Sequence, residues 1–567
     1  MASASVRRYL PVLGVGVGLV VYPFLVKDPF WQNLAVLVLI NATAAAAWNL
    51  LGGFAGQISF GHSIFFGVGA YSTGFLLLRF GWSPWLGLLV GAVVAIGIGL
   101  VIGFPVFRLR SHYFSIATIA LQQVLFIVVV NSKALGQATG LELPIRPQSL
   151  AQLQFSTRDL TTYHLLALVL FGLASGAVWL YMRGRLGAYL KALRDDEEVA
   201  RAIGIAVRRH KLYAISLSAA LTALAGGYYA MYSLFVDPNV VFSLTQSIAI
   251  VLVAVLGGAG SLWGPLIGAW VLGIIQDQGY AVQRGQFAGL CDLRPSRCRH
   301  RGLPAGRSGR DGGEGKALAG AACTLSLMQI SQLSRRFGGV VAVDGVDLEV
   351  RSSEILGLIG PNGAGKSTLF ALLAGAIRPS SGTIRFDGRE VTGWSADQAA
   401  RAGVGRTFQV VRVFRSMTVL ENVMVAAYLH NPTIREARAA AQAVLARVGL
   451  TQQSDQLATN LSVASKRRLE MARALATRPR LLLLDEVMSG LTPVEANAAA
   501  ELVRQLNFDG LTVVLVEHVM EVVMPLSARI VVLDQGRKIA DGKPEEIAQD
   551  DAVIRAYLGP PLSRAAG

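Results

Sequence analysis

The chain has 567 residues, of which 53% are apolar and 16% are charged, and its mean hydropathy is +0.49. This composition excludes an ordinary soluble protein, so part of the chain must lie in lipid, and the length suffices for several domains. The formal net charge of +16 favours basic cytoplasmic loops of a membrane protein over a nucleic-acid partner.

The N-terminal segment has a basic start followed by an apolar run, a pattern that a signal peptide also shows. No small-residue cleavage site follows the run, and further apolar segments come directly after it, so we interpret it as a first membrane helix. Stretches near the ~20 residues that cross a bilayer predict spans at about 9–26, 34–52, 63–79, 85–107, 114–131, 163–182 and 212–235.

Basic residues predict that the N-terminus lies in the cytoplasm, because with that orientation all their clusters fall on one side. The clusters are Arg7 and Arg8, Arg108 and Arg110, and the loop after the sixth span. The apolar, Gly-rich region 246–276 must then return the chain to the cytoplasm. A single crossing, with or without a re-entrant segment, satisfies this count, whereas two crossings require one more helix.

The loop at 184–220, after the sixth span, predicts an amphipathic cytoplasmic helix with solvated charges. It also resembles the coupling loop of ABC-importer permeases, in which a short acidic helix ends at a Gly and docks on an ATPase subunit. Glu198, Ala202 and Gly204 match the central positions of that loop. With GGFAGQISFGHSIFFGVGAYS at 52–72 and VLGGAGSLWGPLIGA at 255–269, residues 10–276 resemble permeases of high-affinity branched-chain amino acid importers.

Gln57 and His62 lie in the first of these Gly-rich segments. Polar side chains at membrane depth often mark a transport pathway, which makes both residues pathway candidates. A structural role, in which they bond to the backbone or to neighbouring helices, is an equal alternative.

Residues 277–327 form a basic, Gly- and Arg-rich linker that contains all three cysteines, Cys291, Cys298 and Cys323. Three Cys give no disulfide framework, and a zinc site that uses Cys291, Cys298 and His300 lacks the usual spacing and a fourth ligand. The plain interpretation is a flexible tether near anionic lipid. Similar permeases carry another apolar helix here, so a frame-shifted stretch or a fusion join is an alternative.

A phosphate-binding loop follows at 357–370, GLIGPNGAGKSTLF, between an apolar strand and a helical pattern. Backbone N–H groups of such a loop cradle phosphates, Lys366 reaches the β- and γ-phosphates of ATP, and Ser367 offers a hydroxyl to Mg²⁺. The predicted nucleotide-binding residues of the loop are Gly360, Pro361, Asn362, Gly363, Ala364, Gly365, Lys366, Ser367 and Thr368.

The run LLLLDE at 481–486 predicts a buried strand that ends in two carboxylates. Asp485 is placed to help hold Mg²⁺, and Glu486 is placed to polarise the attacking water. Together with Lys366, these residues predict ATP hydrolysis.

Three further positions match motifs of the ABC ATPase family. The resemblance implies that Gln409 in GRTFQ senses Mg²⁺ and contacts the permease, and that His518 in VLVEHV lies near the γ-phosphate as a catalytic residue. It also implies that Phe337 in RRFGG stacks on adenine, although a lone Phe before a strand is more often part of a core.

The signature segment departs from the family pattern. Where the family has L-S-G-G-Q or L-S-Y-G-Q, this chain has LSVAS from Leu461, so Ser462 remains but Ala464 replaces a Gly and Ser465 replaces a Gln. In ABC proteins this helix N-terminus contacts the γ-phosphate bound to the opposite subunit, and an added Cβ crowds that approach. We therefore expect one weakened composite ATP site in the assembled dimer.

The predicted architecture is a polytopic α-helical membrane domain followed by an α/β P-loop ABC ATPase domain. We place the permease at 1–276, the linker at 277–327 and the ATP-binding domain at 328–567. The resemblance implies ATP-driven import of branched-chain amino acids across the plasma membrane, with the ATP-binding domain in the cytoplasm. It also implies a second permease, a second ATPase and an extracytoplasmic substrate-binding protein as partners. The alternatives are import of urea or short amides, an ABC exporter, and an ATPase-impaired regulator.

Overall fold

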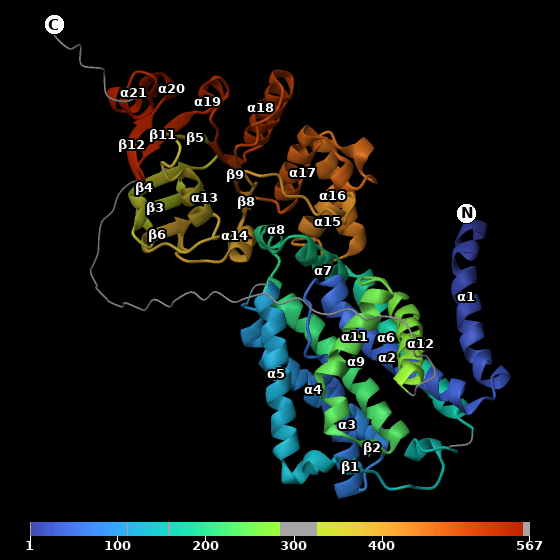
Figure 1. Cartoon of the computed structure of the whole chain (residues 1–567). Coiled ribbons are helices and arrows are strands. Elements are labelled where there is room, and N and C mark those ends of the chain that lie inside the picture. The colour runs from blue at the N-terminus through green and yellow to red at the C-terminus, as the bar shows by residue number, and fades with distance from the viewer. Residues whose placement is uncertain (1, 110, 157–158, 284–325, 559–567) are drawn as a thin grey trace.

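A helical bundle and a layered α/β unit make up the part of the chain that the structure describes (Figure 1). The structure is a computed structural model, and it describes residues 2–109, 111–156, 159–283 and 326–558.

Long helices dominate the N-terminal half. Their bounds are α1 (Ala2–Leu25), α2 (Pro29–Asn49), α3 (His62–Phe80), α4 (Pro84–Val106), α5 (Ser111–Asn131), α6 (Thr161–Arg183) and α9 (Val207–Ser233). Six of the seven are long and apolar enough to cross a membrane, with α2 continuing as one turn of π-helix over Leu50–Phe54. In α1 the described apolar part, Gly14–Leu25, is shorter than in these six.

Small residues let the membrane helices approach one another closely. A Cβ added to Gly69 in α3 would lie 1.9 Å from the carbonyl oxygen of Ala223 in α9, and one added to Gly226 would lie 1.9 Å from that of Phe66. Side chains cannot occupy such space, so these glycines allow α3 and α9 to pack backbone against backbone, as close packing in lipid requires.

Shorter elements complete the membrane half. They are α7 (Arg185–Asp195), α8 (Glu197–Ala202), α10 (Pro238–Val241), α11 (Leu244–Leu256), α12 (Gly264–Gln283), β1 (Leu141–Glu142) and β2 (Phe235–Val236). The segment after β2 is a broken helix, because Phe242 and Ser243 interrupt it between α10 and α11. Ser243 accepts a hydrogen bond from the N–H of Gln246 and so caps α11.

Region 246–276 forms two neighbouring helices, α11 and α12, joined by a turn. The turn lies at the end of the bundle that faces the ATPase portion, where the N–H of Gly260 donates to Asn49 Oδ1 at 2.7 Å. From there α12 runs back, and Gln276 shares a cavity with Phe30 and Asn33 near the opposite end of α2. The region therefore forms two helices that run in opposite directions along the bundle, and the number of times that it crosses the membrane stays a prediction.

The second half has two sheets. A six-stranded sheet has the order β12-β11-β5-β10-β9-β8 and is parallel except for its β12 edge, and a four-stranded antiparallel sheet has the order β4-β3-β6-β7. The strands are β3 (Ser326–Phe337), β4 (Val340–Arg351), β5 (Ile355–Ile359), β6 (Ser381–Phe386), β7 (Arg389–Glu390), β8 (Val404–Arg406), β9 (Leu481–Asp485), β10 (Thr512–Val516), β11 (Arg529–Asp534) and β12 (Arg537–Gly542). Strands β5, β9 and β10 are buried along their whole length, as expected for central parallel strands.

Helices surround these sheets and form a separate helical lobe beside them (Figure 1). Their bounds are α13 (Lys366–Leu373), α14 (Ala396–Ala402), α15 (Val419–Ala427), α16 (Ile434–Arg447), α17 (Val463–Ala476), α18 (Pro493–Phe508), α19 (Met520–Leu526), α20 (Pro544–Ile547) and α21 (Asp551–Leu558). Capping boxes fix the first turns of α15, α16 and α18, each with a Thr at the N-cap and a Glu three residues later.

The course of α12 predicts which side of the membrane its two ends face. In a chain whose three cysteines are replaced by Ser, Ala259→Cys in the turn should react with a membrane-impermeant maleimide only from the cytoplasmic side. Gln276→Cys should not react from that side, because α12 carries it away from the turn toward the opposite end of α2. Labelling of both positions from the same side would contradict the described course of α12.

Candidate nucleotide site and its contact with the membrane half

The phosphate-binding loop joins β5 to α13 and has the strand–loop–helix context that its sequence predicts. Two of its glycines are required sterically. A Cβ at Gly360 would lie 2.1 Å from the carbonyl oxygen of Leu533, and one at Gly365, whose φ is +98°, would lie 2.3 Å from that of Ala342. Gly363 also has a positive φ, so the loop turns through conformations that favour glycine.

Lys366 begins α13 and folds back over the loop. Its ammonium group donates to the carbonyl oxygens of Gly360 at 2.7 Å and Pro361 at 2.9 Å. Burial lowers the pKa of Lys366, although Glu486 and Asp485 partly offset this effect. The neighbouring Asn362 and Ser367 are exposed, so this end of α13 is open to a ligand.

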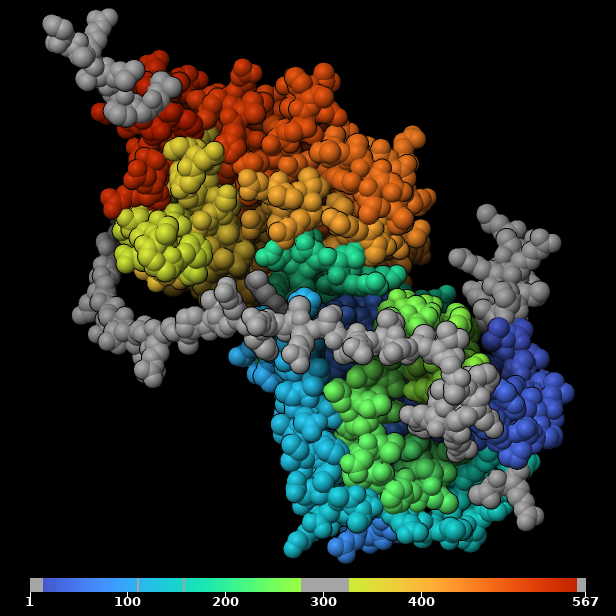
Figure 2. All heavy atoms as spheres, viewed as in Figure 1, coloured from blue at the N-terminus to red at the C-terminus, as the bar shows by residue number. Residues whose placement is uncertain are grey.

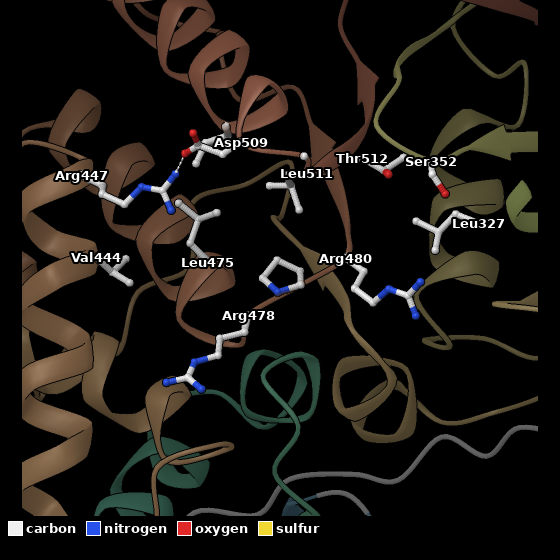
Figure 3. Close-up of a pocket in the computed structure, with 13 residues that line it drawn as sticks. Leu327, Ser352, Val444, Arg447, Leu475, Arg478, Arg480, Asp509, Leu511 and Thr512 are labelled. Atoms are coloured by element: carbon white, nitrogen blue, oxygen red, sulfur yellow. Dashed lines mark hydrogen bonds and ion pairs between the residues drawn. The ribbon is translucent and has the colours of Figure 1, made fainter. Parts of the chain in front are cut away.

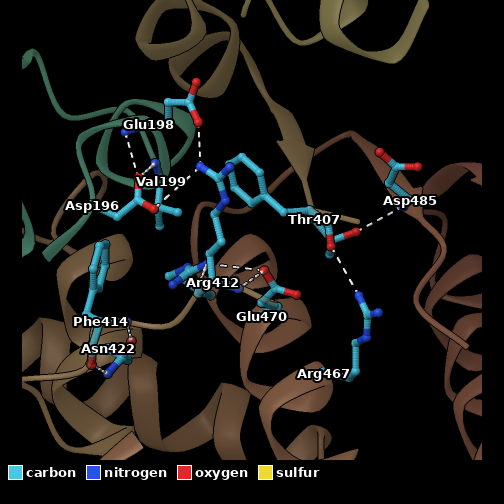
Figure 4. Close-up of polar contacts among 12 residues, drawn as sticks. Asp196, Glu198, Val199, Thr407, Arg412, Phe414, Asn422, Arg467, Glu470 and Asp485 are labelled. Carbon is cyan, nitrogen blue, oxygen red and sulfur yellow. Dashed lines mark hydrogen bonds and ion pairs between the residues drawn. The ribbon is translucent and has the colours of Figure 1, made fainter. Parts of the chain in front are cut away.

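Asp485 ends β9 and is almost fully buried. Its backbone N–H donates to Thr407 Oγ1 at 3.1 Å, while its Oδ1 takes no hydrogen bond from any described residue (Figure 4). Burial raises the pKa of Asp485, and Arg406, 3.8 Å from its Oδ2, acts against that rise. A buried carboxylate oxygen without a partner fits a hard cation such as Mg²⁺.

Two predicted site residues, Gln409 and His518, contact the same carboxylate oxygen of a third, Glu486. Glu486 Oε1 accepts from Gln409 Nε2 at 3.1 Å and lies 2.7 Å from His518 Nε2. Glu486 has a positive φ of 48°, and its N–H donates to the carbonyl oxygen of Val516 in β10. Segments far apart in sequence thus converge on the carboxylate that follows β9.

Phe337 lies at the end of β3, where 46% of its surface is exposed and the Arg335 guanidinium lies 4.6 Å from its ring centroid. The ring is therefore not a core residue, and its position agrees with the predicted stacking surface for a base. Its contact with adenine stays a prediction.

The signature segment forms the first turn of α17. Ser462 is the N-cap, and its Oγ accepts from the N–H of Ser465 at 3.2 Å and lies 3.2 Å from the Ser465 hydroxyl. The Ser that replaces the family's Gln therefore bonds to the one signature Ser that this chain retains. Ala464 is partly exposed in the same turn.

The predicted coupling loop forms two short helices, α7 and α8, rather than one amphipathic helix, because Asp196 ends the first and caps the second. These helices lie directly against the ATPase portion, as the space-filling view shows for the teal segment below the orange helices (Figure 2). Ala202 ends α8, which packs against α14. Gly204 has a φ of 88°, and its carbonyl oxygen accepts from Arg401 at 2.9 Å.

Glu198, the acidic residue of the predicted loop, forms an ion pair with Arg412 of the ATPase portion. The sequence did not single out Arg412, Glu470 or Thr407, because isolated Arg, Glu and Thr residues carry no motif. One available signal was that Arg412 follows Gln409 by three residues, in the segment expected to contact the permease.

The two pathway candidates have protein partners. His62 is fully buried and its Nε2 lies 2.9 Å from the hydroxyl of Ser218 in α9, while Gln57 donates to Glu197 of α8 at 3.3 Å. These contacts favour the structural interpretation of both residues. Cys291, Cys298 and His300, considered for zinc, lie outside the described residues.

A cavity of about 460 Å³ lies between the sheet and the helical lobe, away from the phosphate-binding loop (Figure 3). Three arginines line it, but each has a partner: Arg447 with Asp509, Arg478 with Asn431, and Arg480 with Asp387. None of the predicted site residues lines this cavity.

Comparisons with known proteins cover both halves. Residues 30–289 match the family described as branched-chain amino acid transport system / permease component, and residues 343–489 match ABC transporters. Residues 537–559 match a family described as branched-chain amino acid ATP-binding cassette transporter.

The high-affinity branched-chain amino acid transport ATP-binding protein LivG of Salmonella typhimurium is 45% identical over 249 residues, which are 41% of this chain and 98% of LivG. BraF of Pseudomonas aeruginosa, with the same description, is 43% identical over the same shares. A nucleotide-free ATP-binding cassette of known structure is 26% identical, with a TM-score of 0.39, over 41% of this chain and 100% of that one.

The matches and the described architecture agree on a multi-pass membrane portion and a cytoplasmic portion that binds ATP and couples its hydrolysis to transport. The chain belongs to the branched-chain amino acid ABC transporter family and joins a permease component and an ATP-binding component in one polypeptide.

Proposed function

We propose that this chain imports branched-chain amino acids as one half of an ABC importer, with a second permease, a second ATPase and an extracytoplasmic substrate-binding protein. The observation that carries the proposal is the docking of α7–α8 on the ATPase portion through Glu198 and Arg412, beside the converged Glu486, Gln409 and His518. A membrane half and a hydrolytic site in direct contact form the arrangement that ATP-driven transport requires.

In this proposal the ATP site works mainly by positioning and by neutralising charge. Lys366 leaves its backbone partners to bind the β- and γ-phosphates, while the amides of residues 360–368 cradle the phosphate oxygens. Glu486 orients and polarises the attacking water, and His518 lies beside the γ-phosphate. Phe337 stacks on the base.

We further propose that Ser367, Gln409 and Asp485 would hold Mg²⁺. The unpartnered Oδ1 of Asp485 and the exposed hydroxyl of Ser367 are oxygen donors of the kind that this ion prefers. Bound there, the ion would supply charge neutralisation on the phosphates. Gln409 would then join the ion's ligands to Glu486, to which its Nε2 donates at 3.1 Å.

Radiolabelled leucine uptake tests the proposed function. Proteoliposomes that contain the assembled complex, ATP inside and binding protein outside should accumulate leucine. Glu486→Gln should abolish uptake while ATP still binds, because the variant loses the water-polarising carboxylate but keeps Lys366. Competition with valine, urea and short amides then identifies the substrate class.

Other results of the same assay support the alternatives. Substrate movement only out of the ATP-containing lumen would identify an exporter. ATP turnover that substrate and binding protein fail to stimulate would favour a regulator over a transporter.

The signature segment leads to a second proposal, that the composite ATP site completed by Ser462 is the weaker of two. Ala464→Gly combined with Ser465→Gln should raise ATP turnover severalfold, because it frees the Ser462 hydroxyl and removes a Cβ at the helix N-terminus. Ala439→Gly, at an exposed position within α16, is the control for a new helix glycine. Unchanged turnover in the double variant would show that the departures do not weaken this site.

A further inference from the structure

The C-terminal helices α20 and α21 pack beside β11 and β12, away from the membrane half (Figure 1). They share a small apolar core that is separate from the two larger apolar cores of the described residues. Its buried members, each at most 7% exposed, are Ile359, Val523, Ile530, Val532, Ile547 and Val553. This core joins the C-terminal helices to segments that occur much earlier in the chain.

Two of those segments lead directly into the nucleotide site. Ile359 ends β5, and the phosphate-binding loop continues from the next residue, Gly360. Val523 belongs to α19, which starts two residues after His518 and also packs Met520 against the same core. The apolar contacts of α20 and α21 therefore support the start of the phosphate-binding loop and the helix that follows His518.

A polar contact adds to this apolar support. The hydroxyl oxygen of Tyr557, near the end of α21, accepts a hydrogen bond from the backbone of Gly360. Burial raises the pKa of Tyr557, and this hydrogen bond acts against the rise. A phenol whose pKa lies above its usual value of about 10 is neutral at physiological pH, so the contact is an ordinary hydrogen bond between uncharged groups.

Gly360 is closely surrounded on other sides as well. A Cβ at this position would lie 2.1 Å from the carbonyl oxygen of Leu533, and the Gly360 carbonyl oxygen accepts from the Lys366 ammonium group at 2.7 Å. When Lys366 turns to the phosphates of ATP, that carbonyl oxygen loses its partner. The contact with Tyr557 does not involve Lys366, so it can remain in place while the nucleotide is bound.

The far end of the loop is held differently. The N–H of Gly536 donates to the carbonyl oxygen of Ala364 at 3.1 Å, and the N–H of Asp344 donates to the carbonyl oxygen of Gly536 at 2.8 Å. These bonds join main chain to main chain and do not depend on a side chain. At the start of the loop, by contrast, the contact with α21 depends on the single hydroxyl of Tyr557.

We propose that Tyr557 is a positioning residue of the nucleotide site, which holds the first residue of the phosphate-binding loop in place while Lys366 binds the phosphates. Tyr557 acts through Gly360 and not on the reacting atoms. Its loss should therefore weaken nucleotide binding more than it slows hydrolysis, because Glu486 and His518 belong to other segments of the site. This inference rests on the proposed role of Lys366.

Nucleotide binding to the full-length chain in lipid nanodiscs, measured with a fluorescent ATP analogue and Mg²⁺, tests this role. Tyr557→Phe should raise the dissociation constant roughly 2- to 10-fold, which is the effect of losing one ordinary hydrogen bond. In the assembled complex the same variant should raise the KM for ATP by a similar factor and leave kcat within about twofold of the wild type, as expected for lost binding alone.

Arg555→Gln is the matched control, because Arg555 is an exposed residue of α21 whose Nε donates to the carbonyl oxygen of Asp551 in the same helix. It should change neither the dissociation constant nor the KM. Tyr557→Ala, which also removes the ring, should raise the dissociation constant at least as much as Tyr557→Phe. The unfolding temperature of Tyr557→Phe should match that of the wild type, which shows that α21 stays packed.

Wild-type affinity in Tyr557→Phe would overturn the inference even if Tyr557→Ala binds weakly, because the ring would then act by packing alone. A kcat that falls as far as the KM rises would also overturn it. Tight nucleotide binding by Lys366→Met would remove its premise.

The proposed function and the role of Tyr557 fail separately. Failure of leucine uptake together with the expected loss of affinity in Tyr557→Phe would reject the proposed substrate or direction and support the role of Tyr557. Normal leucine uptake with unchanged affinity in Tyr557→Phe would reject that role and leave the proposed function standing.

Discussion

The contact of α7 and α8 with the ATPase portion is the constraint on which the rest of the molecule depends. Buried apolar side chains run without interruption from the membrane helices through α7 and α8 into α15, α16 and α17. Tyr189 meets Tyr428 edge-on, with ring centroids 6.1 Å apart. A Cβ on Gly204 would lie 2.7 Å from Leu429. Ion pairs and hydrogen bonds then fix the register of this apolar contact.

This contact can pass a movement from one half of the molecule to the other, because neither the membrane side nor the ATPase side can rearrange independently. On the membrane side, close backbone packing of α3 against α9 and the buried Lys211–Glu197 pair leave little room for adjustment. On the ATPase side, burial raises the pKa of Glu470 to about 7, with Arg473 acting against that rise. Burial of a carboxylate is unfavourable by itself. Glu470 is therefore stabilised in this position by its hydrogen-bond and ion-pair partners.

Sequence reasoning predicted the elements that carry motifs and missed those that depend on contacts between distant segments. The strand–loop–helix of the phosphate site, the buried strand before Asp485 and the long apolar helices follow from local patterns, and the structure contains all of them. The convergence of Gln409 and His518 on Glu486 was implied by family resemblance, and its geometry required the fold.

Other features could not be obtained from local patterns. Region 246–276 is largely apolar, and hydropathy alone does not reveal that its central turn lies against Asn49 and reverses the direction of the chain. Gln57 had the properties of a pathway residue because a polar side chain among glycines is conspicuous. Its partner, Glu197, is 140 residues away in the sequence. The ion pair of Arg412 with Glu198 likewise arises only when the two halves meet.

The central claim is that the membrane and ATPase portions of the same chain dock on each other through α7 and α8. Cross-linking of Asp195→Cys with Ser416→Cys, in a chain whose three native cysteines are replaced by Ser, tests it most directly, because the two native side chains lie 2.8 Å apart. The account predicts a disulfide within one polypeptide, visible as a mobility shift without an increase in mass. A disulfide that joins two polypeptides, or no disulfide under oxidising conditions, would contradict it.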